Sequence, residues 1–408
     1  MKGKKKLFIV IPLIVTIIFT ALCSYGLMLF HKEREKQIAQ WNDTVWFTFS
    51  DTIEYGEGSV TLSSREMAKY KSTEDVYNSY VYYNTLKKEE KIIYKAMQYA
   101  YDNNYVYFHV EQKALPESEY SLMDILTFLS LDSPVIQQNL DAEWYDHELT
   151  TSNVILGKVV ERKLEGDTIF VDNFSEERTA EADKAVEKIK KWDLEIPEDA
   201  DDTEKARAFY RYIDENIEYS SAKVEKGVDY LCLAVTSGKT NCDGFANTFS
   251  LLCNMNGIKC FEKLSEPGEE DEEGHTWNTV MLSGEWYHVD CTPAQNIESK
   301  DGVRELLRFG YSDEFQLDIA DYEGVFPECN QNINPVACHL DACSSDNALS
   351  EITDAYRESE NDWIIIAFDV FDEEECDLFQ NVANRLYLDI DIITISGDEI
   401  TLCYLTKK

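Results

Sequence analysis

The sequence predicts an α+β fold in which a helix that begins with a cysteine packs on an antiparallel sheet. The helix is indicated by residues 242–256, where Phe245 and Phe249 fall on one apolar face. The sheet is indicated by residues 274–290, where two alternating stretches flank residues 283–284, a Ser-Gly pair typical of a hairpin turn. We expect a mainly helical N-terminal region before this core and a small α+β region after it.

The charge of the chain excludes one class of function. The 408 residues include 38 Lys plus Arg and 78 Asp plus Glu, which gives a net charge of −40. A protein that binds nucleic acid electrostatically needs basic side chains to neutralise phosphates, so we expect no nucleic-acid partner. With 44% hydrophobic residues, the chain has enough apolar material for two or three packed domains.

Residues 7–30 are predicted to form a transmembrane anchor. This run contains no Asp, Glu, Lys or Arg and exceeds the roughly 20 residues that a helix needs to cross a bilayer. Lysines dominate residues 1–6, so the positive-inside rule predicts a cytoplasmic N-terminus and places the chain from His31 onward outside. A cleaved signal peptide is one alternative, although the run is long for one and no Ala-x-Ala site follows. Lipidation of Cys23 is another, disfavoured by the large Leu22 before it.

The region 31–200 is predicted to be extracytoplasmic and mainly helical, with some strands. Its tyrosines could line a groove for a sugar or a peptide, but we interpret them as core aromatics. The predicted helices lie within residues 73–103, 120–129 and 176–192, and strand-like patterns cover residues 105–110 and 153–163. An acidic segment interrupted by proline, residues 197–202, ends this region.

Cys242 is the candidate nucleophile. A thiol at the start of a helix faces unpaired N–H groups and the positive end of the helix dipole, which stabilise a thiolate. Gly244 and Ala246 keep the first turn small, so the helix start can approach its neighbours closely. A buried structural cysteine is the alternative interpretation.

The predicted hairpin brings a histidine and an aspartate together. If the turn sets the register, Leu282 faces Glu285, and His275 and Asp290 become diagonal neighbours on one face of the sheet. Their backbones would lie about 7–8 Å apart, a gap that the two side chains can bridge with a hydrogen bond. A carboxylate that holds one imidazole nitrogen leaves the other free to take the proton of a thiol such as that of Cys242.

Two neighbouring features allow more than one interpretation. His288 shares a sheet face with Asp290 and could compete as the base, but its place within a strand favours a packed histidine. The acidic residues 269–273 could attract cationic substrates such as lysine side chains, although we interpret them as a solvated loop.

Three motifs, taken in this order, resemble the transglutaminase-like superfamily of papain-like thiol enzymes. They are residues 238–246 around Cys242, the triplet at residues 275–277, and residues 286–292. With a lead-in helix at residues 203–218, the resemblance covers roughly residues 203–313, and we place the domain at 201–315. A weaker resemblance links the tyrosine-rich N-terminal region to anchored bacterial surface proteins.

The resemblance implies a papain-like core in which a central helix carrying the cysteine packs on an antiparallel sheet. It also implies that Cys242 is the nucleophile, His275 the general base and later acid, and Asp290 the residue that orients the imidazole. Members of the superfamily attack carboxamide or peptide carbonyls, form a thioester, and pass the acyl group to water or to an amine. Cys291 departs from the pattern, since proline is common there, and would add a second thiol near the site.

The C-terminal region 316–408 is predicted to be an α+β appendage. Residues 301–347 look irregular apart from a short helix at 304–309, and residues 362–405 read as strand, helix, strand and strand. The chain has eleven cysteines, and the only tight cluster, in which a local disulfide is plausible, consists of Cys329, Cys338 and Cys343.

No metal or organic cofactor is expected. The sequence contains no Cys-x-x-Cys, no His-Glu-x-x-His, and no glycine-rich phosphate or dinucleotide motif. We therefore expect a single-pass membrane protein whose extracytoplasmic bulk is a cysteine hydrolase or acyltransferase. Its expected substrate is a peptide or protein, for example one at the cell surface. A non-catalytic surface module that keeps the fold to bind protein or glycan is the rival hypothesis.

Overall fold

A computed structural model describes most of the chain from residue 46 onward. The described residues are 28–29, 32, 46–50, 59–72, 75–103, 105, 107–110, 120, 122–137, 143–146, 152–155, 159–165, 168–174, 184–220, 230–264, 274–293, 303–315, 327–343, 347–370, 373–394 and 401–407. Of the predicted anchor at 7–30, only Met28 and Leu29 belong to this set, and the acidic residues 269–273 lie outside it. Among the described residues, none of the helices combines the length and the apolar character needed to cross a membrane.

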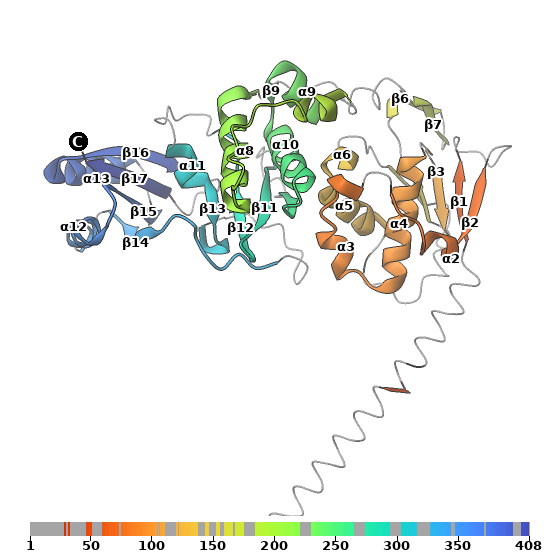
Figure 1. The fold of residues 1–408 in the computed structure, drawn as a ribbon, viewed down its shortest axis with the longest axis horizontal. Coiled ribbons are helices and arrows are strands. Elements are labelled where there is room, and N and C mark those ends of the chain that lie inside the picture. Colours follow the sequence, from red (N-terminus) through yellow and green to blue (C-terminus); the bar gives the residue numbers. More distant parts are fainter. Residues whose placement is uncertain are drawn as a thin grey trace, which may run out of the picture.

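The N-terminal part contains both helices and an antiparallel sheet. The sheet has the strand order β2-β1-β3-β5-β4, and the helices α4 and α5 lie beside it (Figure 1). The bounds are β1 Trp46–Ser50, β2 Val60–Ser63, α2 Ser64–Met67, η1 Asp75–Tyr77, α3 Val81–Thr85, α4 Lys88–Asp102, β3 Tyr107–Val110, α5 Leu122–Asp132, α6 Pro134–Gln137, β4 Glu143–Asp146, β5 Ser152–Ile155, β6 Val159–Glu165 and β7 Thr168–Phe174. Residues 184–189 are also helical, within the helix predicted at 176–192.

The aromatic side chains of this part form its core, as the sequence analysis expected. Tyr82 and Tyr94 are fully buried, and the ring of Tyr82 stacks on Phe128 with centroids 5.0 Å apart. The apolar stripe of α4 faces the same cluster through Ile93 and Met97. We therefore interpret these tyrosines as packing residues.

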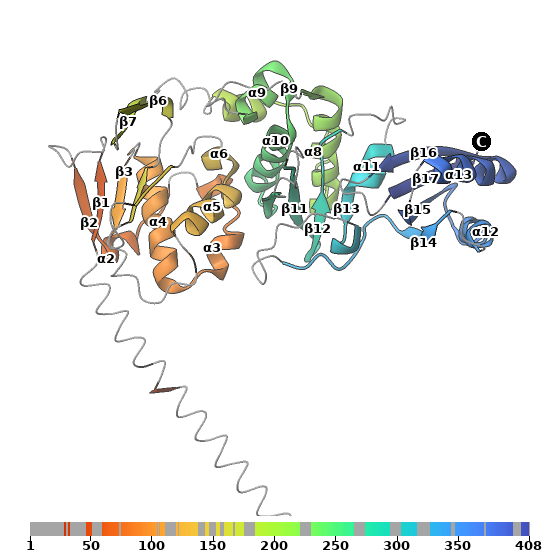
Figure 2. The same ribbon diagram turned by 180° about the vertical axis from the view of Figure 1, so that it is seen from behind.

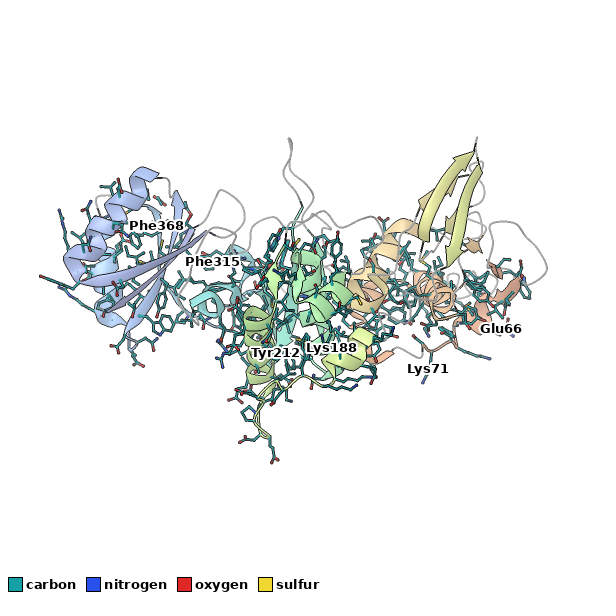
Figure 3. All side chains as sticks on the ribbon, turned by 90° about the horizontal axis from the view of Figure 1, so that it is seen from above. Glu66, Lys71, Lys188, Tyr212, Phe315 and Phe368 are labelled. Carbon is teal, nitrogen blue, oxygen red and sulfur yellow. The ribbon has the colours of Figure 1, made fainter. Side chains whose placement is uncertain are left out.

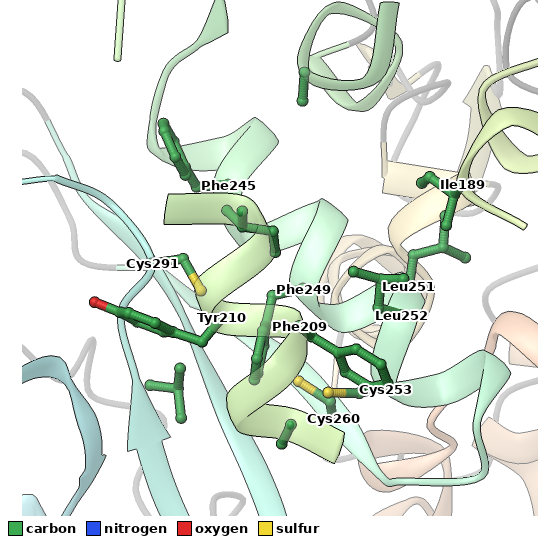
Figure 4. Close-up of a cluster of buried hydrophobic side chains, with 14 of the residues drawn as sticks. Ile189, Phe209, Tyr210, Phe245, Phe249, Leu251, Leu252, Cys253, Cys260 and Cys291 are labelled. Atoms are coloured by element: carbon green, nitrogen blue, oxygen red, sulfur yellow. The ribbon is translucent and has the colours of Figure 1, made fainter. Parts of the chain in front are cut away.

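The central part has the predicted architecture, a helix on an antiparallel sheet with the order β10-β11-β12-β13. The helix α10 packs on this sheet through a buried cluster to which α8 adds Phe209 and Tyr210 (Figure 4). The bounds are α8 Asp202–Asn216, β8 Glu218–Tyr219, α9 Tyr230–Ser237, β9 Lys239–Thr240, α10 Cys242–Met255, β10 Cys260–Leu264, β11 Thr276–Leu282, β12 Glu285–Val289 and β13 Phe309–Tyr311. The predicted α+β class is confirmed.

The hairpin of β11 and β12 has the predicted register. Leu282 pairs with Glu285, and the pairing continues without a shift to Asn278 and Val289. The turn residues Ser283 and Gly284 have φ values of 54° and 93°, as the two central residues of a type I′ turn require. The turn therefore sets which side chains share a face farther along both strands.

The C-terminal part is a four-stranded sheet with the order β14-β15-β17-β16 and two helices. The predicted succession of strand, helix, strand and strand is confirmed, as is the short helix α11. The central part ends with α11 Val303–Arg308 and η3 Asp313–Phe315, and the bounds of the C-terminal part are β14 Val336–Ala342, α12 Ala348–Glu358, β15 Trp363–Val370, α13 Glu373–Leu386, β16 Leu388–Thr394 and β17 Thr401–Lys407. The three parts follow one another along the molecule (Figures 1 and 2).

Two strands contradict the sequence prediction. Residues 301–347 were expected to be irregular apart from one helix, yet β13 and β14 lie among them. The strand β13 pairs antiparallel to β12, and β14 pairs parallel to β15. Burial alternates along the edge strand β14, and the less exposed positions hold the apolar residues Val336, Cys338, Leu340 and Ala342. The period-two pattern is therefore present in the sequence, and the sequence analysis missed it.

The C-terminal sheet packs against α11 and β13 of the central part. Leu307 and Tyr311 share a buried cluster with Ile365, Leu402 and Tyr404. Figure 3 shows Phe315 at this junction, whereas Phe368 lies within the C-terminal sheet. The C-terminal part therefore supports the helix that precedes β13.

The predicted local disulfide is wrong. In the part of the chain that the structure describes, Cys329, Cys338 and Cys343 form no disulfide with one another. Cys343 belongs to the core of the C-terminal sheet, whereas Cys329 lies beside Asp313 next to the central sheet. These cysteines are close in sequence, but the fold places them in two separate environments.

Candidate active site

Cys242 is the first residue of α10. The side chain of Asn241 caps the helix by accepting a hydrogen bond of 3.3 Å from the Gly244 N–H. Only glycine fits at position 244 without a steric clash, because a Cβ atom there would lie 1.9 Å from the Thr240 Oγ1. The half-buried thiol therefore sits where the sequence analysis placed it, at the positive end of a buried helix.

Two hydrogen bonds fix the start of α10 to the start of β11. The Thr276 hydroxyl donates to Asp243 Oδ1 at 2.6 Å, and the Asn278 amide donates to the Ala246 carbonyl at 3.0 Å. Since His275 directly precedes Thr276, these bonds hold the histidine near the thiol. The sequence analysis assigned no role to Asp243 or Thr276.

The structure brings His275 and Asp290 together as the hairpin register predicted. His275 Nε2 lies 3.0 Å from Asp290 Oδ2, and the side chains are 21% and 5% exposed. The imidazole also forms a hydrogen bond with the Cys242 side chain. Because Nε2 is engaged by Asp290, Nδ1 is the nitrogen available to the thiol.

Asp290 is held by a residue that the sequence analysis did not identify. Arg308, at the end of α11, donates from Nη1 to the carboxylate, and the Thr292 N–H donates to its other oxygen at 2.8 Å. Burial opposes the negative charge, but the positive charges of Arg308 and His275 outweigh it and hold the pKa of Asp290 well below its usual range. Asp290 is therefore a permanent anion.

Arg308 itself is placed by the packing of α11. Glu305, one turn earlier and buried, accepts hydrogen bonds from Arg211 at 2.5 Å and from Arg207. Both arginines belong to α8, which packs against α10 in the same core. The helix that carries the cysteine and the helix that carries Arg308 are thus connected through α8.

His275 is positively charged at neutral pH in this arrangement. Burial alone would lower its pKa, but the charge of Asp290 and the hydrogen bonds to Asp290 and Cys242 raise it to about 10. A cationic imidazole beside a thiol is the electrostatic environment that stabilises a thiolate. Burial and the charge of Asp243 also raise the pKa of Tyr230, so its phenol stays protonated.

His288 is a packed histidine, as the sequence analysis favoured, and does not compete as the base. It is 1% exposed, accepts a hydrogen bond from Trp277 Nε1 at Nδ1, and lies 2.8 Å from Asp313 through Nε2. Burial lowers its pKa to about 4. Its ring is therefore neutral and fully engaged.

Cys291 does not add a reactive thiol to the site. Its side chain is 3% exposed and lies in the core with Tyr210, as Figure 4 shows. Burial and the nearby charge of Asp290 raise the pKa of this thiol well above its usual range. The sequence position next to Asp290 suggested that this thiol lies near the site, but the Cys291 side chain lies in the core.

One group of side chains among the described residues could be considered as metal ligands. The ligand atoms of His288, Asp313 and Cys329 lie within 4.8 Å of one another. These residues are distinct from Cys242, His275 and Asp290.

Comparison with known proteins agrees with the fold. Residues 190–291 match the model of the transglutaminase-like superfamily, so the chain contains a transglutaminase-like domain. The chain is 32% identical to human kyphoscoliosis peptidase over 135 residues, which cover 28% of this chain and 19% of that protein. The mouse protein of the same name is 32% identical over 107 residues, covering 22% of this chain and 16% of its own length. The match therefore spans about a fifth of these relatives.

Two solved structures are similar to parts of the chain. A crystal structure of a TGase is 17% identical and covers 40% of this chain and 46% of its own, with a TM-score of 0.25. The periplasmic domain of TgpA from Pseudomonas aeruginosa is 14% identical and covers 35% of this chain and 55% of its own, with a TM-score of 0.13.

Proposed function

We propose that the protein is a cysteine hydrolase or acyltransferase that acts on peptide or amide bonds through Cys242, His275 and Asp290. One observation carries the proposal. The imidazole of His275 forms a hydrogen bond of 3.0 Å with the buried carboxylate of Asp290 and a second hydrogen bond with the thiol of Cys242 at the start of α10. Acyl transfer by a cysteine requires a nucleophile, a base that contacts it, and a group that orients the base.

In the first half of the reaction, the Cys242 sulfur attacks the carbonyl carbon of the substrate. His275 takes the proton of the thiol, and the anionic Asp290 stabilises the positive charge of the imidazole. Negative charge then develops on the carbonyl oxygen, and the Cys242 backbone N–H at the start of α10 is the donor that we assign to it.

In the second half, His275 gives its proton to the departing amine, and the C–N bond breaks to leave a thioester on Cys242. Water then attacks the thioester, with His275 accepting its proton, and the acid is released. A primary amine can take the place of water, in which case a new amide forms. Both outcomes use the same three residues, so the proposal covers hydrolysis and transfer.

We further propose that the enzyme is a single-pass membrane protein of the cell-surface type, with its bulk outside the cytoplasm. The uncharged run at residues 7–30 and the lysines before it support this. Protease added to intact cells should digest residues 31–408 while a tag placed before residue 1 stays protected. Digestion of the N-terminal tag instead would contradict this orientation.

The test of the chemistry is selective alkylation of Cys242. Iodoacetamide should label Cys242 in the full chain at pH 6–7 faster than it labels a free model thiol, because the adjacent imidazolium stabilises the thiolate. The label should disappear in Cys242→Ala and form much more slowly in His275→Ala. Cys338→Ala, which removes a half-buried thiol far from the triad in sequence, is the matched control and should leave the rate unchanged.

The reaction type follows from incubation of wild type with a set of peptides, with and without methylamine. New peptide termini indicate hydrolysis, and a methylamide product indicates transfer. If Cys242 labels no faster than a free thiol in wild type, the enzymatic proposal fails and the binding module becomes the better hypothesis.

A further inference from the structure

The imidazole of His275 has an aromatic neighbour that restricts its plane. The rings of His275 and Trp277 have centroids 6.0 Å apart and planes inclined by only 16°. A hydrogen bond to Asp290 fixes one nitrogen of the imidazole but leaves the ring able to swing about that contact. A buried indole beside it, only 1% exposed, limits this swing.

Trp277 is in turn fixed by His288. Its indole N–H donates to His288 Nδ1 at 3.1 Å, with both side chains buried. An indole can only donate, so Nδ1 has to be unprotonated, and the neutral ring carries its proton on Nε2. That proton is donated to Asp313 Oδ1, which lies 2.8 Å away.

Asp313 is fixed by backbone contacts. Its second oxygen accepts the Cys329 N–H at 2.8 Å, and its own N–H donates to the Cys329 carbonyl at 2.8 Å. A continuous chain of hydrogen bonds thus runs from the backbone at Cys329 through Asp313 and His288 to the ring of Trp277.

A metal ion at His288, Asp313 and Cys329 is the competing explanation for this cluster. To bind a metal through Nε2, His288 would have to carry its proton on Nδ1, where it would meet the indole N–H of Trp277. Two donors would then face each other in a buried site. The buried Lys263 places a further positive charge near Cys329 and Asp313, which also opposes a cation.

We propose that His288 is a positioning residue for the reaction proposed above: by fixing the indole of Trp277, it holds the His275 imidazole in the plane that Cys242 and Asp290 need. His288 touches neither the sulfur nor the substrate. The inference rests on the proposed roles of Cys242 and His275.

The test compares two substitutions at His288 that differ in one hydrogen bond. His288→Asn puts a carbonyl oxygen close to the former position of Nδ1 and can still accept from Trp277, whereas His288→Leu cannot. Misplacement of a catalytic group costs roughly 10- to 100-fold in rate. The alkylation rate of Cys242 at pH 7 should fall by that factor in His288→Leu and stay within about threefold of wild type in His288→Asn.

Trp277→Phe keeps an aromatic ring but removes the donor, and it should slow alkylation as His288→Leu does. His339→Asn is the matched control, since His339 also lies against a carboxylate, Asp369 at 2.6 Å, but in the C-terminal sheet. It should leave alkylation unchanged. Circular dichroism identifies folded variants, and if His288→Leu fails to fold, Trp277→Phe and His288→Asn decide the question.

A second measurement separates this inference from the proposed function. In an NMR spectrum of the full chain with labelled tryptophan, the indole N–H signal of Trp277 should shift in His288→Leu and stay close to wild type in His288→Asn. Should wild-type Cys242 prove unreactive while this signal behaves as expected, the proposed function fails and the hydrogen bond stands. The positioning role would be overturned if His288→Leu folds and its Cys242 is alkylated at the wild-type rate. It would also be overturned if wild type binds one equivalent of Zn²⁺ and Cys329→Ser does not.

Discussion

At the scale of residues, two histidines on one face of the central sheet differ in charge, since one is a cation and the other is neutral. Both are buried, and burial alone would keep each of them neutral. His275 faces the permanent anion Asp290 and the Cys242 thiol, which raise its pKa to about 10, whereas burial prevails at His288 and lowers its pKa to about 4. One ring is therefore suited to proton transfer, and the other to a fixed hydrogen bond.

The raised pKa of His275 predicts how stability depends on pH. A group whose pKa is higher in the folded state contributes stability that is complete below its unfolded value, about 6.5, and is lost as the pH rises through its folded value, about 10. Between pH 6.5 and 10, the Tm of wild type should therefore fall more steeply than the Tm of His275→Gln. Parallel curves for the two proteins would contradict the charged state of His275.

Removing Arg308 should be costly. Arg308→Met would leave the buried Asp290 without its strongest cation, and breaking a buried ion pair costs about 3–5 kcal/mol. The free energy of unfolding in urea should fall by that amount, and alkylation of Cys242 should slow because Asp290 no longer orients His275.

The control for Arg308 is an exposed ion pair. Arg357, which is 72% exposed, pairs with Asp354 on α12, and an exposed pair contributes about 0–1 kcal/mol. Arg357→Met should leave both unfolding and alkylation close to wild type. Equal losses in the two variants would show that Arg308 has no special relation to the site.

At the scale of elements, the start of α10 is the most constrained place in the central part. The Cβ of an alanine at position 244 would meet Thr240 Oγ1 at 1.9 Å and its Cβ at 2.7 Å, so the strand β9 and the helix would have to separate. Because the thiol lies at this junction, even a small displacement changes its distance to His275.

Gly244→Ala should therefore abolish the rapid alkylation of Cys242 even where the protein stays folded. Gly257→Ala, beyond the other end of α10, is the comparison. Gly257 has a φ of +76° and no atom within contact of an added Cβ, so alanine there should cost about 1–2 kcal/mol of stability and leave alkylation intact. Rapid alkylation in Gly244→Ala would show that the contact with Thr240 does not set the position of the sulfur.

The elements also show what a sequence can predict about this site. The hairpin register followed from a two-residue turn, so the contact between His275 and Asp290 could be derived from local chemistry alone. Arg308 could not, because it lies 18 residues beyond Asp290 and reaches it only through the packing of α11 on its neighbours. The strand β14 could have been predicted, because apolar residues alternate from Val336 to Ala342, but only Leu340 among them is buried, which makes the pattern weak.

At the scale of the whole molecule, the dominant physical property is the net charge of −40. A surplus of like charges repels itself most strongly in the compact state, which lowers stability at low ionic strength. Salt at about 0.15 M reduces the Debye length to about 8 Å and weakens this repulsion.

The Tm should therefore rise as NaCl increases from about 0.01 M to 0.15 M. The rise should also appear in Cys242→Ala, since it depends on the whole surface and not on the site. A Tm that falls with added salt would mean that attractive surface pairs outweigh the net repulsion.

The packing of the C-terminal sheet on α11 determines when, during synthesis, the surroundings of Arg308 become complete. Cys242, His275 and Asp290 leave the ribosome well before β17, whose Leu402 and Tyr404 cover Leu307, the neighbour of Arg308. A nascent chain can form the hairpin and the helix, yet it lacks the strand that completes the packing around α11. We expect the thiol to gain full reactivity only after β17 has been made and has packed against α11.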